Sequence, residues 1–342
     1  MSYGDGFKRR KVESSVEYKP STRFMPLGGR NYTVSVAIPT SILSDCSTSE
    51  QRINAPSRIA RALAIFSIDE VVVFDDSPAD SRPPAVDHDA YTGDTDPGHY
   101  LFHLLSYMET PPFMRKALFP LHPNLRLQGL LPTLEMPHHP HRDEHLPYME
   151  ALSLPGKPDN PAHKTIVDLG LRKPVSIAEA IPPKTRLTLH FPDESFDNGT
   201  PVDPAAPRTD AGYYWGFQIR RCSSLSGVFT EAPFEGGYDV SIGTSERGEP
   251  ASHVFPRSAT ATTDPPALAF QHLVIVFGGP RGLEYAAMND PELASVGIKV
   301  ANVREAFDHW VDVLPNQGNR SIRTDEAIFI ALTELRRLWS DV

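Results

Sequence analysis

The sequence predicts an α/β fold with a mostly parallel sheet and a small β module inserted into it. An apolar stretch at residues 32–38, a helical repeat at 57–65 and a β-branched run at 70–74 form a strand–helix–strand unit. Short alternating runs between residues 165 and 191, separated by turn residues, are typical of an antiparallel module. In the last third of the chain, polar segments that contain glycine follow apolar runs, as at the strand ends of an α/β sheet.

The other elements follow from periodicity and from turn residues. Before the module, helices are expected at residues 99–109 and 113–119. Within it, strands are expected at 165–171, 175–177 and 186–191. After it, the expected elements are strands at 212–220, 238–242 and 273–277, and helices at 225–229, 303–313 and 326–339.

Length and composition indicate an ordinary globular protein. The chain has 342 residues, enough for two domains or for one domain with a large insertion, and 40% of them are hydrophobic. The net charge of −10 argues weakly against nucleic-acid binding. Seven aspartates between Asp75 and Asp96 carry much of that charge, so the remaining surface can hold a basic face. No apolar run approaches the roughly 20 residues of a membrane span, and no membrane segment is expected.

We assign residues 30–130 and 211–342 to the α/β domain, 131–210 to the inserted module and 1–29 to a flexible basic tail. The basic cluster at residues 8–11 fits a nuclear-localisation signal and a solvated tail equally well. The two cysteines form neither a zinc spacing nor a disulfide framework, which indicates a reducing, intracellular location.

Three polar segments predict one small-molecule site: residues 243–248, 278–282 and 315–324. Glycine lets the backbone approach a ligand closely, and parallel strands end at one edge of the sheet. The 278–282 segment matches neither a P-loop nor a dinucleotide fingerprint. A single Gly-Gly turn is usually only a turn, but three such segments together favour a binding site.

Two further clusters have competing interpretations. Residues 138–145 are rich in histidine, but Pro140 prevents the helical alignment of metal ligands, so we expect no metal site and favour RNA or surface contact. Basic residues on the module suit single-stranded nucleic acid and an ordinary soluble surface about equally well; they are Lys164, Arg172, Lys173, Lys184 and Arg186. A hydrolase is disfavoured because the chain lacks a G-x-S-x-G elbow.

Two motifs connect these segments to a known family. IGTSERG at residues 242–248 and NQGNRSIRTDEA at 316–327, with YTVSVAIPTSIL at 32–43 and LVIVFGG at 273–279, resemble the SPOUT-class RNA methyltransferases. The resemblance is strongest to the eukaryotic and archaeal branch that includes the human centromere-associated SPOUT-domain enzyme. It implies a deep C-terminal trefoil knot, an OB-like inserted β-barrel and a homodimer.

The resemblance also implies the cofactor S-adenosylmethionine, which leaves as S-adenosylhomocysteine. Carried over by motif, the cofactor residues are Gly243, Thr244, Ser245, Gly278, Gly279, Gly282, Asn316, Gln317, Gly318, Ile322, Arg323 and Thr324. Catalysis is expected from Glu246, Arg247 and Arg61, and RNA contact from Arg58, Lys164, Arg172 and Lys173. The alternatives without a catalytic role are a local ion pair between Glu246 and Arg247, and an ordinary surface position for Arg61.

The leading hypothesis is a nuclear or nucleolar RNA methyltransferase that modifies a base nitrogen of ribosomal RNA, with N3 of uridine as the first choice by family analogy. A second is a catalytically silent knotted scaffold that binds RNA or a centromere or spindle partner. The third, a conventional nucleotide-binding α/β enzyme, would be excluded by a C-terminal knot.

Overall fold

The computed structural model describes residues 26, 28–82, 85–139, 146–160, 162–170, 173–193, 196, 198–256 and 268–339. The basic cluster at residues 8–11, the expected RNA contact Arg172 and the 140–145 part of the histidine-rich segment lie outside these residues. Within the described ranges, no helix combines the length and the apolar character needed to cross a membrane.

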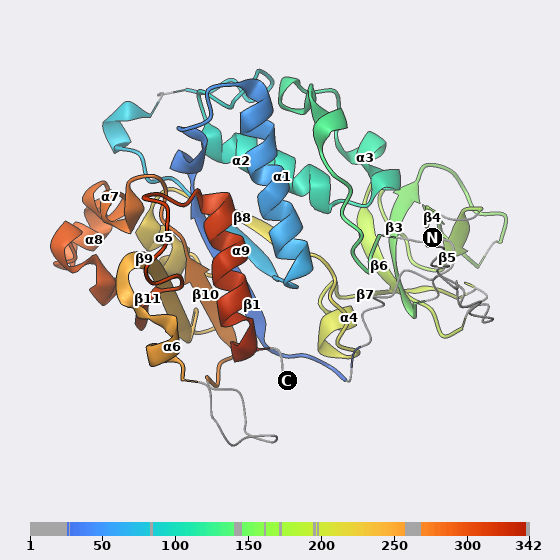
Figure 1. The fold of residues 1–342 in the computed structure, drawn as a ribbon. Coiled ribbons are helices and arrows are strands. Elements are labelled where there is room, and N and C mark those ends of the chain that lie inside the picture. The colour runs from blue at the N-terminus through green and yellow to red at the C-terminus, as the bar shows by residue number, and fades with distance from the viewer. Residues whose placement is uncertain are drawn as a thin grey trace, which may run out of the picture.

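A six-stranded sheet forms the centre of the molecule, and all its neighbouring strands run parallel (Figure 1). The strand order is β11-β9-β10-β1-β2-β8. The strands are β1 (Thr33–Pro39), β2 (Glu70–Phe74), β8 (Gln218–Cys222), β9 (Val240–Pro250), β10 (His272–Val276) and β11 (His309–Asp312). The predicted α/β class with a mostly parallel sheet is therefore confirmed.

Both faces of this sheet are buried, which explains why its central strands are continuously apolar. In β2, Val71 and Val73 enter one core, while Val72 and Phe74 enter the core on the opposite face. Each such side chain contributes about 1.5–3 kcal/mol when it leaves water. A sheet covered in this way can bind a ligand only at the ends of its strands.

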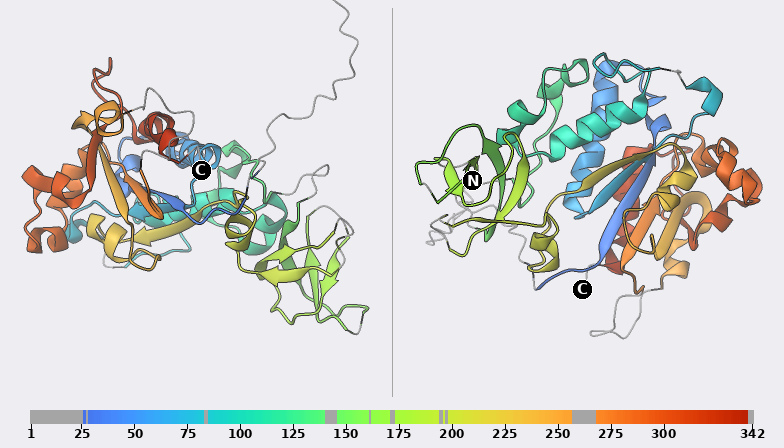
Figure 2. Two further views of the ribbon diagram at one scale, coloured as in Figure 1. Left: turned by 90° about the horizontal axis from the view of Figure 1, so that it is seen from below. Right: turned by 180° about the vertical axis from the view of Figure 1, so that it is seen from behind.

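Helices cover the two faces in separate groups (Figure 2). The first core contains α1 (Ser49–Ile65), α2 (Pro97–Glu109) and α9 (Thr324–Leu335). The second contains α5 (Leu225–Thr230), α7 (Gly282–Met288) and α8 (Pro291–Ser295). The start of α1 is fixed by a capping box, in which Thr48 Oγ1 accepts from the Gln51 amide at 3.2 Å and Gln51 Oε1 accepts from the Thr48 amide.

Short helices occupy the connections. They are the α-helices α3 (Pro112–Leu118), α4 (Ala206–Thr209) and α6 (Ala251–Val254). The 3₁₀ turns are η1 (Thr40–Leu43), η2 (Ala79–Ser81), η3 (Pro123–Leu125), η4 (Gln128–Leu130), η5 (Val300–Ala306) and η6 (Arg336–Leu338). Of these, η1 matters most for function because it follows directly after the central strand β1.

Three local predictions are wrong, in whole or in part. The strand expected at 212–220 begins only at Gln218. The expected helix at residues 303–313 is instead η5 followed by the edge strand β11, whose Val311 is fully buried against β9. The apolar spacing of so short a strand mimics one helical turn, and only pairing across the sheet separates the two possibilities. The strand expected at 238–242 continues to Pro250, so the segment 243–248 is part of a strand and not a separate loop.

A second sheet, antiparallel, lies at one end of the molecule (Figures 1 and 2). It contains β3 (Tyr148–Leu154), β4 (Thr165–Asp168), β5 (Val175–Ile177), β6 (Arg186–His190) and β7 (Thr200–Val202), in the order β5-β4-β3-β6-β7. The sheet has its own apolar core around Ala151, Val167 and Leu189. All five strands fall within the range predicted for the inserted module, although the sequence analysis predicted neither β3 nor β7.

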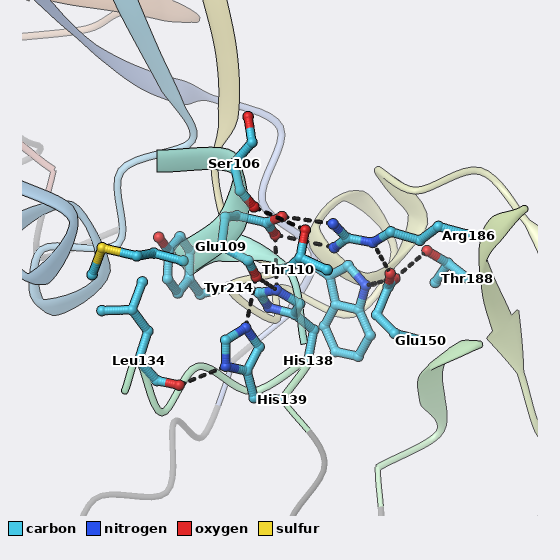
Figure 3. A network of polar contacts seen from close by, with 12 residues as sticks. Ser106, Glu109, Thr110, Leu134, His138, His139, Glu150, Arg186, Thr188 and Tyr214 are labelled. Carbon is cyan, nitrogen blue, oxygen red and sulfur yellow. Dashed lines mark hydrogen bonds and ion pairs between the residues drawn. The ribbon is translucent and has the colours of Figure 1, made fainter. Parts of the chain in front are cut away.

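A buried ionic network fastens the antiparallel sheet to α2 (Figure 3). Arg186 of β6 donates to Glu109 Oε2 at 2.6 Å and to Glu150 Oε2 at 2.5 Å. Glu150 also accepts from Thr188 Oγ1 at 2.6 Å and from Trp215 Nε1 at 2.8 Å. The Arg186 guanidinium is therefore occupied by two carboxylates, which fits neither of the alternatives considered for it, contact with nucleic acid or plain surface coverage.

The charge state of Glu109 follows from its partners. Burial alone would raise the pKa of Glu109, but Arg186 and His138 outweigh it and hold this pKa well below its usual range. The pairing therefore stabilises the fold fully above the ordinary glutamate pKa of about 4.3, and the contribution is lost as the pH falls through the folded pKa.

The described histidines of the histidine-rich segment also belong to this network. His138 Nε2 lies 2.8 Å from Glu109 Oε1, and His139 Nε2 lies 2.7 Å from the Glu109 carbonyl oxygen. Both rings are buried, so the prediction of RNA or surface contact is wrong for these two residues. Among the described residues, no group of three or more potential ligand side chains is placed to hold a metal ion.

Arg186→Met is expected to destabilise the protein by about 3–5 kcal/mol, because it leaves two buried carboxylates without their cation. Denaturant unfolding at pH 7 measures the effect. The matched control Arg304→Met removes an exposed arginine and should change stability by less than about 0.5 kcal/mol. Equal stability of the two variants would show that the buried network does not hold the antiparallel sheet to α2.

Candidate functional site

A cavity of about 710 Å³ lies where β9 and β10 end, and the N-terminal part of α1 and the start of α9 close its sides. This volume is within the usual range for small-molecule sites. All three of the predicted segments reach it. Of the expected cofactor residues, those that line the cavity are Thr244, Ser245, Gly278, Gly279, Gly282, Gln317, Ile322, Arg323 and Thr324.

The first segment enters the cavity through a break in strand pairing. Trp310 of β11 pairs with Gly243, but the next residue, Val311, pairs with Glu249. Residues 244–248 are therefore left without partners in β11 and bulge toward the cavity. Gly243 lies outside the lining, and a Cβ atom there would come within 2.6 Å of the Trp310 ring, so packing explains this glycine.

The second segment is a turn that only glycine can form. A Cβ atom at Gly278 would lie 2.8 Å from the Leu283 amide nitrogen, and one at Gly279 would lie 2.0 Å from Ser41 Oγ. Gly282 has a φ of +74°, in the left-handed region that other residues rarely adopt. The turn therefore presents bare backbone to the cavity and packs closely against η1.

The third segment joins the cavity at the start of α9. Thr324 Oγ1 donates to the Gly278 carbonyl oxygen at 3.1 Å, which ties the first turn of α9 to the turn after β10. The predicted cofactor residues Asn316 and Gly318 are exposed and lie outside the lining. Asn316 adopts the left-handed region, with a φ of 61°, where it forms the bend that follows β11.

Glu246 and Arg247, at the rim of the cavity, are not paired with each other. Arg247 contacts Glu284 of α7 at 3.3 Å, so Glu246 and Arg247 do not form the local ion pair that was considered. Glu246 is exposed on the cavity wall. Arg58 also lines the cavity and contacts Asp325 at 2.9 Å. Arg61 lies on α1 outside the lining, and its guanidinium donates to the Thr133 carbonyl oxygen at 3.4 Å.

The sequence analysis missed one wall of the cavity. This wall runs from the end of η1 into α1, and apart from Arg58, which the sequence analysis had named as an RNA contact, its residues include Ile42, Asp45, Cys46, Gln51 and Asn54. A signal for it existed, because the strand–helix unit at the start of the chain ends at the same edge of the sheet as β10. Burial raises the pKa of the Cys46 thiol, which keeps it neutral in this wall.

Two expected RNA contacts lie far from this wall in the chain. Lys164 and Lys173 are both exposed and flank β4 in the antiparallel sheet. Neither belongs to the cavity lining. Their position suits contact with a large partner and not with a small molecule.

The donor set of the cavity fits a nucleoside that carries both positive and negative groups. Backbone groups of the glycine turn and of the bulge can bind the polar edge of a flat base. Carboxylates at the wall, Asp45 and Glu246, suit cationic groups, while Arg323 suits an anionic one.

The contact between Gly279 and Ser41 can be tested by stability. Gly279→Ala is expected to cost about 1–3 kcal/mol, because the new methyl group overlaps Ser41 Oγ. In Ser41→Gly/Gly279→Ala the overlap is gone, so the double variant should lose less than the two single variants added together. Strictly additive losses in denaturant unfolding would contradict the close approach.

The amino-acid sequence is similar to those of known RNA methyltransferases. Residues 33–335 match a family model described as "Putative RNA methyltransferase". The 28S rRNA (uridine-N(3))-methyltransferase of Homo sapiens is 41% identical over 316 residues, which cover 90% of this chain and 79% of the human protein. The proteins of the same name from Mus musculus and Drosophila melanogaster are 39% and 38% identical, and the matches cover 77% and 62% of their lengths. The chain thus belongs to this family of RNA methyltransferases.

Proposed function

We propose that this protein transfers the methyl group of S-adenosylmethionine to N3 of a uridine in ribosomal RNA, as an enzyme of the SPOUT class. The observation that carries the proposal is the meeting of three distant segments, at residues 244–248, 278–282 and 317–324, in one cavity. The names of the human, mouse and fly relatives describe this same reaction.

The residues of the cavity fit the proposed cofactor. Gly278 and Gly279 line the cavity, and close packing against Leu283 and Ser41 excludes a side chain at either position, so the adenine edge would meet backbone groups there. Gln317, Ile322 and Thr324 would close the opposite side. The cofactor supplies a methyl group that is already electrophilic, so the protein mainly has to place the nucleophile in line with it.

N3 of uridine carries a proton, which has to leave for the nitrogen to act as a nucleophile. Glu246 is the candidate acceptor, because its carboxylate lies on the cavity wall and has no ion pair among the described residues. Arg247, held by Glu284, is placed to anchor the RNA beside it. Arg58 and Arg61 on α1 extend this basic surface away from the cavity.

We further propose that the C-terminal segment is threaded as a trefoil knot. The order of the sheet puts β11 at its edge, whereas α9 packs in the core above the central strands (Figure 1). Residues 313–323 therefore have to return across the ends of β9 and β10. The hydrogen bond between Thr324 and Gly278 marks where this return meets the β10 turn.

The remaining parts of the proposal concern RNA, assembly and location. The antiparallel sheet would serve as an OB-like arm that grips RNA through Lys164 and Lys173, together with Arg172. We also propose a homodimer, which sedimentation would test. A nuclear or nucleolar location is supported by the basic cluster at residues 8–11 and is tested by imaging a fluorescent fusion. The alternative of a silent scaffold is less favoured, since a scaffold has no need of the glycine turn.

Gln317→Trp should weaken the binding of S-adenosylhomocysteine by about tenfold or more, because the indole would fill the cavity. Isothermal titration calorimetry measures the effect. The matched control Asn319→Trp changes an exposed residue of the same segment that does not line the cavity, and it should leave the affinity within about twofold. Equal affinities for both variants, or no binding by the unaltered protein, would refute the cofactor site.

Glu246→Gln should lower the rate of methyl transfer by about 10²–10⁴-fold while cofactor affinity stays the same. The rate of the variant should also rise more steeply with pH, since hydroxide would then have to remove the proton. Transfer is measured with radiolabelled cofactor and ribosomal RNA from cells that lack the protein, and the modified base is mapped by mass spectrometry. A variant with the original rate and pH profile would exclude Glu246 as the proton acceptor.

A further inference from the structure

Four histidines from three parts of the chain lie together beside α2, outside the lining of the candidate cofactor cavity. His88 precedes the helix and His122 precedes η3, while His99 and His103 lie one turn apart on α2 itself. The ring centres of His103 and His122 are 4.6 Å apart, and that of His99 lies 5.7 Å from the first and 6.0 Å from the second. Rings this close repel one another if they carry charge.

The side chain of Asn124 in η3 lies at the centre of this cluster, and a backbone amide fixes its orientation. A backbone N–H can only donate, so the Asn124 atom that lies 2.9 Å from the Thr92 amide nitrogen is the carbonyl oxygen. The Asn124 NH₂ group then faces Thr92 Oγ1 at 2.8 Å and His103 Nδ1 at 3.4 Å. Because this group can only donate, His103 Nδ1 has to accept and carries no proton. Thr92 and Asn124 are both buried, so water does not replace these partners.

The same reasoning fixes the protons of two more rings. The Asn124 backbone N–H donates to His122 Nδ1 at 3.1 Å, so the proton of His122 is on Nε2, which donates to the His88 carbonyl oxygen at 2.6 Å. The Thr92 hydroxyl already accepts from Asn124, so its own hydrogen is available to His99 Nδ1 at 2.9 Å. All three rings of the network therefore accept at Nδ1 and are neutral.

The charged groups that face the cluster do not offset a charge on its rings. Asp96 accepts from the His99 amide at 2.8 Å, but it is also paired with Arg221 of β8 at 2.7 Å and lies 3.2 Å from His88 Nε2. Arg221 and a protonated His88 both oppose a positive charge on His99. The neutral state is thus favoured by the surroundings as well as by the hydrogen bonds.

The direction of the pH effect follows from the buried position of the rings. Burial, and then the neighbouring rings, lower the pKa of His103 to about 4, and burial lowers the pKa of His99 as well. An exposed histidine has a pKa of about 6.5. The neutral network therefore stabilises the folded arrangement fully above about pH 6.5, and this contribution is lost as the pH falls toward the folded value.

We propose that the histidine cluster is an acid-sensitive latch, which fastens residues 86–96 and η3 to α2 while its rings are neutral and releases them when the rings take up protons. A ring that is protonated at Nδ1 can no longer accept from Thr92 or Asn124, and the charged rings then repel one another. The latch is independent of the proposed methyl transfer.

Opening of the latch has a consequence at the edge of the parallel sheet. In the closed state Asp94 contacts Arg52 of α1, and Asp96 contacts Arg221 of β8. Both carboxylates belong to the fastened segment, so its release uncovers two arginines near the open ends of the strands.

Hydrogen–deuterium exchange of the full chain at about pH 7.5 and about pH 5, corrected for the intrinsic effect of pH on exchange, tests the latch. Protection of residues 86–96 and 122–125 should fall at least about tenfold at the lower pH, whereas the antiparallel sheet should keep its protection. The triple variant His99→Gln/His103→Gln/His122→Gln keeps acceptors that do not titrate, so its protection should change by less than about twofold. The control His253→Gln replaces an exposed histidine elsewhere and should behave like the unaltered protein.

Equal protection of the unaltered protein at both pH values, or a loss that extends equally to the antiparallel sheet, would overturn the proposal. So would a triple variant that loses as much protection as the unaltered protein. Nitrogen-15 NMR of the histidine side chains decides the matter if the triple variant does not fold. At about pH 7.5, the rings of His99, His103 and His122 should be neutral with the proton on Nε2, and His103 should titrate near pH 4. A charged ring at that pH, or a proton on Nδ1, would contradict the latch.

Discussion

The turn after β10 is the point on which the site depends, because three distant parts of the chain meet there. On one side, Gly279 packs so closely against Ser41 of η1 that no side chain fits between them. On the other side, the Gly278 carbonyl oxygen accepts the hydroxyl of Thr324 at the start of α9. The parallel sheet makes this meeting possible, since both of its faces are buried and only the strand ends are open to a ligand.

Local sequence was sufficient for the elements that are buried on both faces. The strand at Glu70–Phe74 is found as expected, because a short apolar run between turn residues has few alternatives. Edge elements were not predictable in the same way. The four residues of β11 form a strand because they pair with β9, and that pairing joins positions about 65 residues apart in the chain.

The walls of the cavity were likewise predictable only in part. Glycines that follow strands indicated two of its walls, whereas η1 carries no unusual composition and becomes a wall only because β1 lies next to β10. Arg186 illustrates the opposite error. In an alternating strand an arginine looks exposed, and nothing in the local sequence shows that two glutamates, one of them 77 residues earlier, surround it.

The buried ionic network makes the contact between the antiparallel sheet and α2 rigid. Removing either partner of such a pair is costly, so the antiparallel sheet and α2 should move as one body. The ion pairs of the cavity, Arg247 with Glu284 and Arg58 with Asp325, are in contrast partly exposed and individually weak. Rigidity therefore resides in the connection between α2 and the antiparallel sheet, and adaptability at the rim of the cavity.

Hydrogen–deuterium exchange with and without S-adenosylhomocysteine tests the central claim most directly. The account predicts simultaneous protection of residues 42–54, 244–248, 278–282 and 317–324, with no change in the antiparallel sheet. Protection confined to one of these segments, or centred on β3 to β6, would contradict a single cofactor site built from all four.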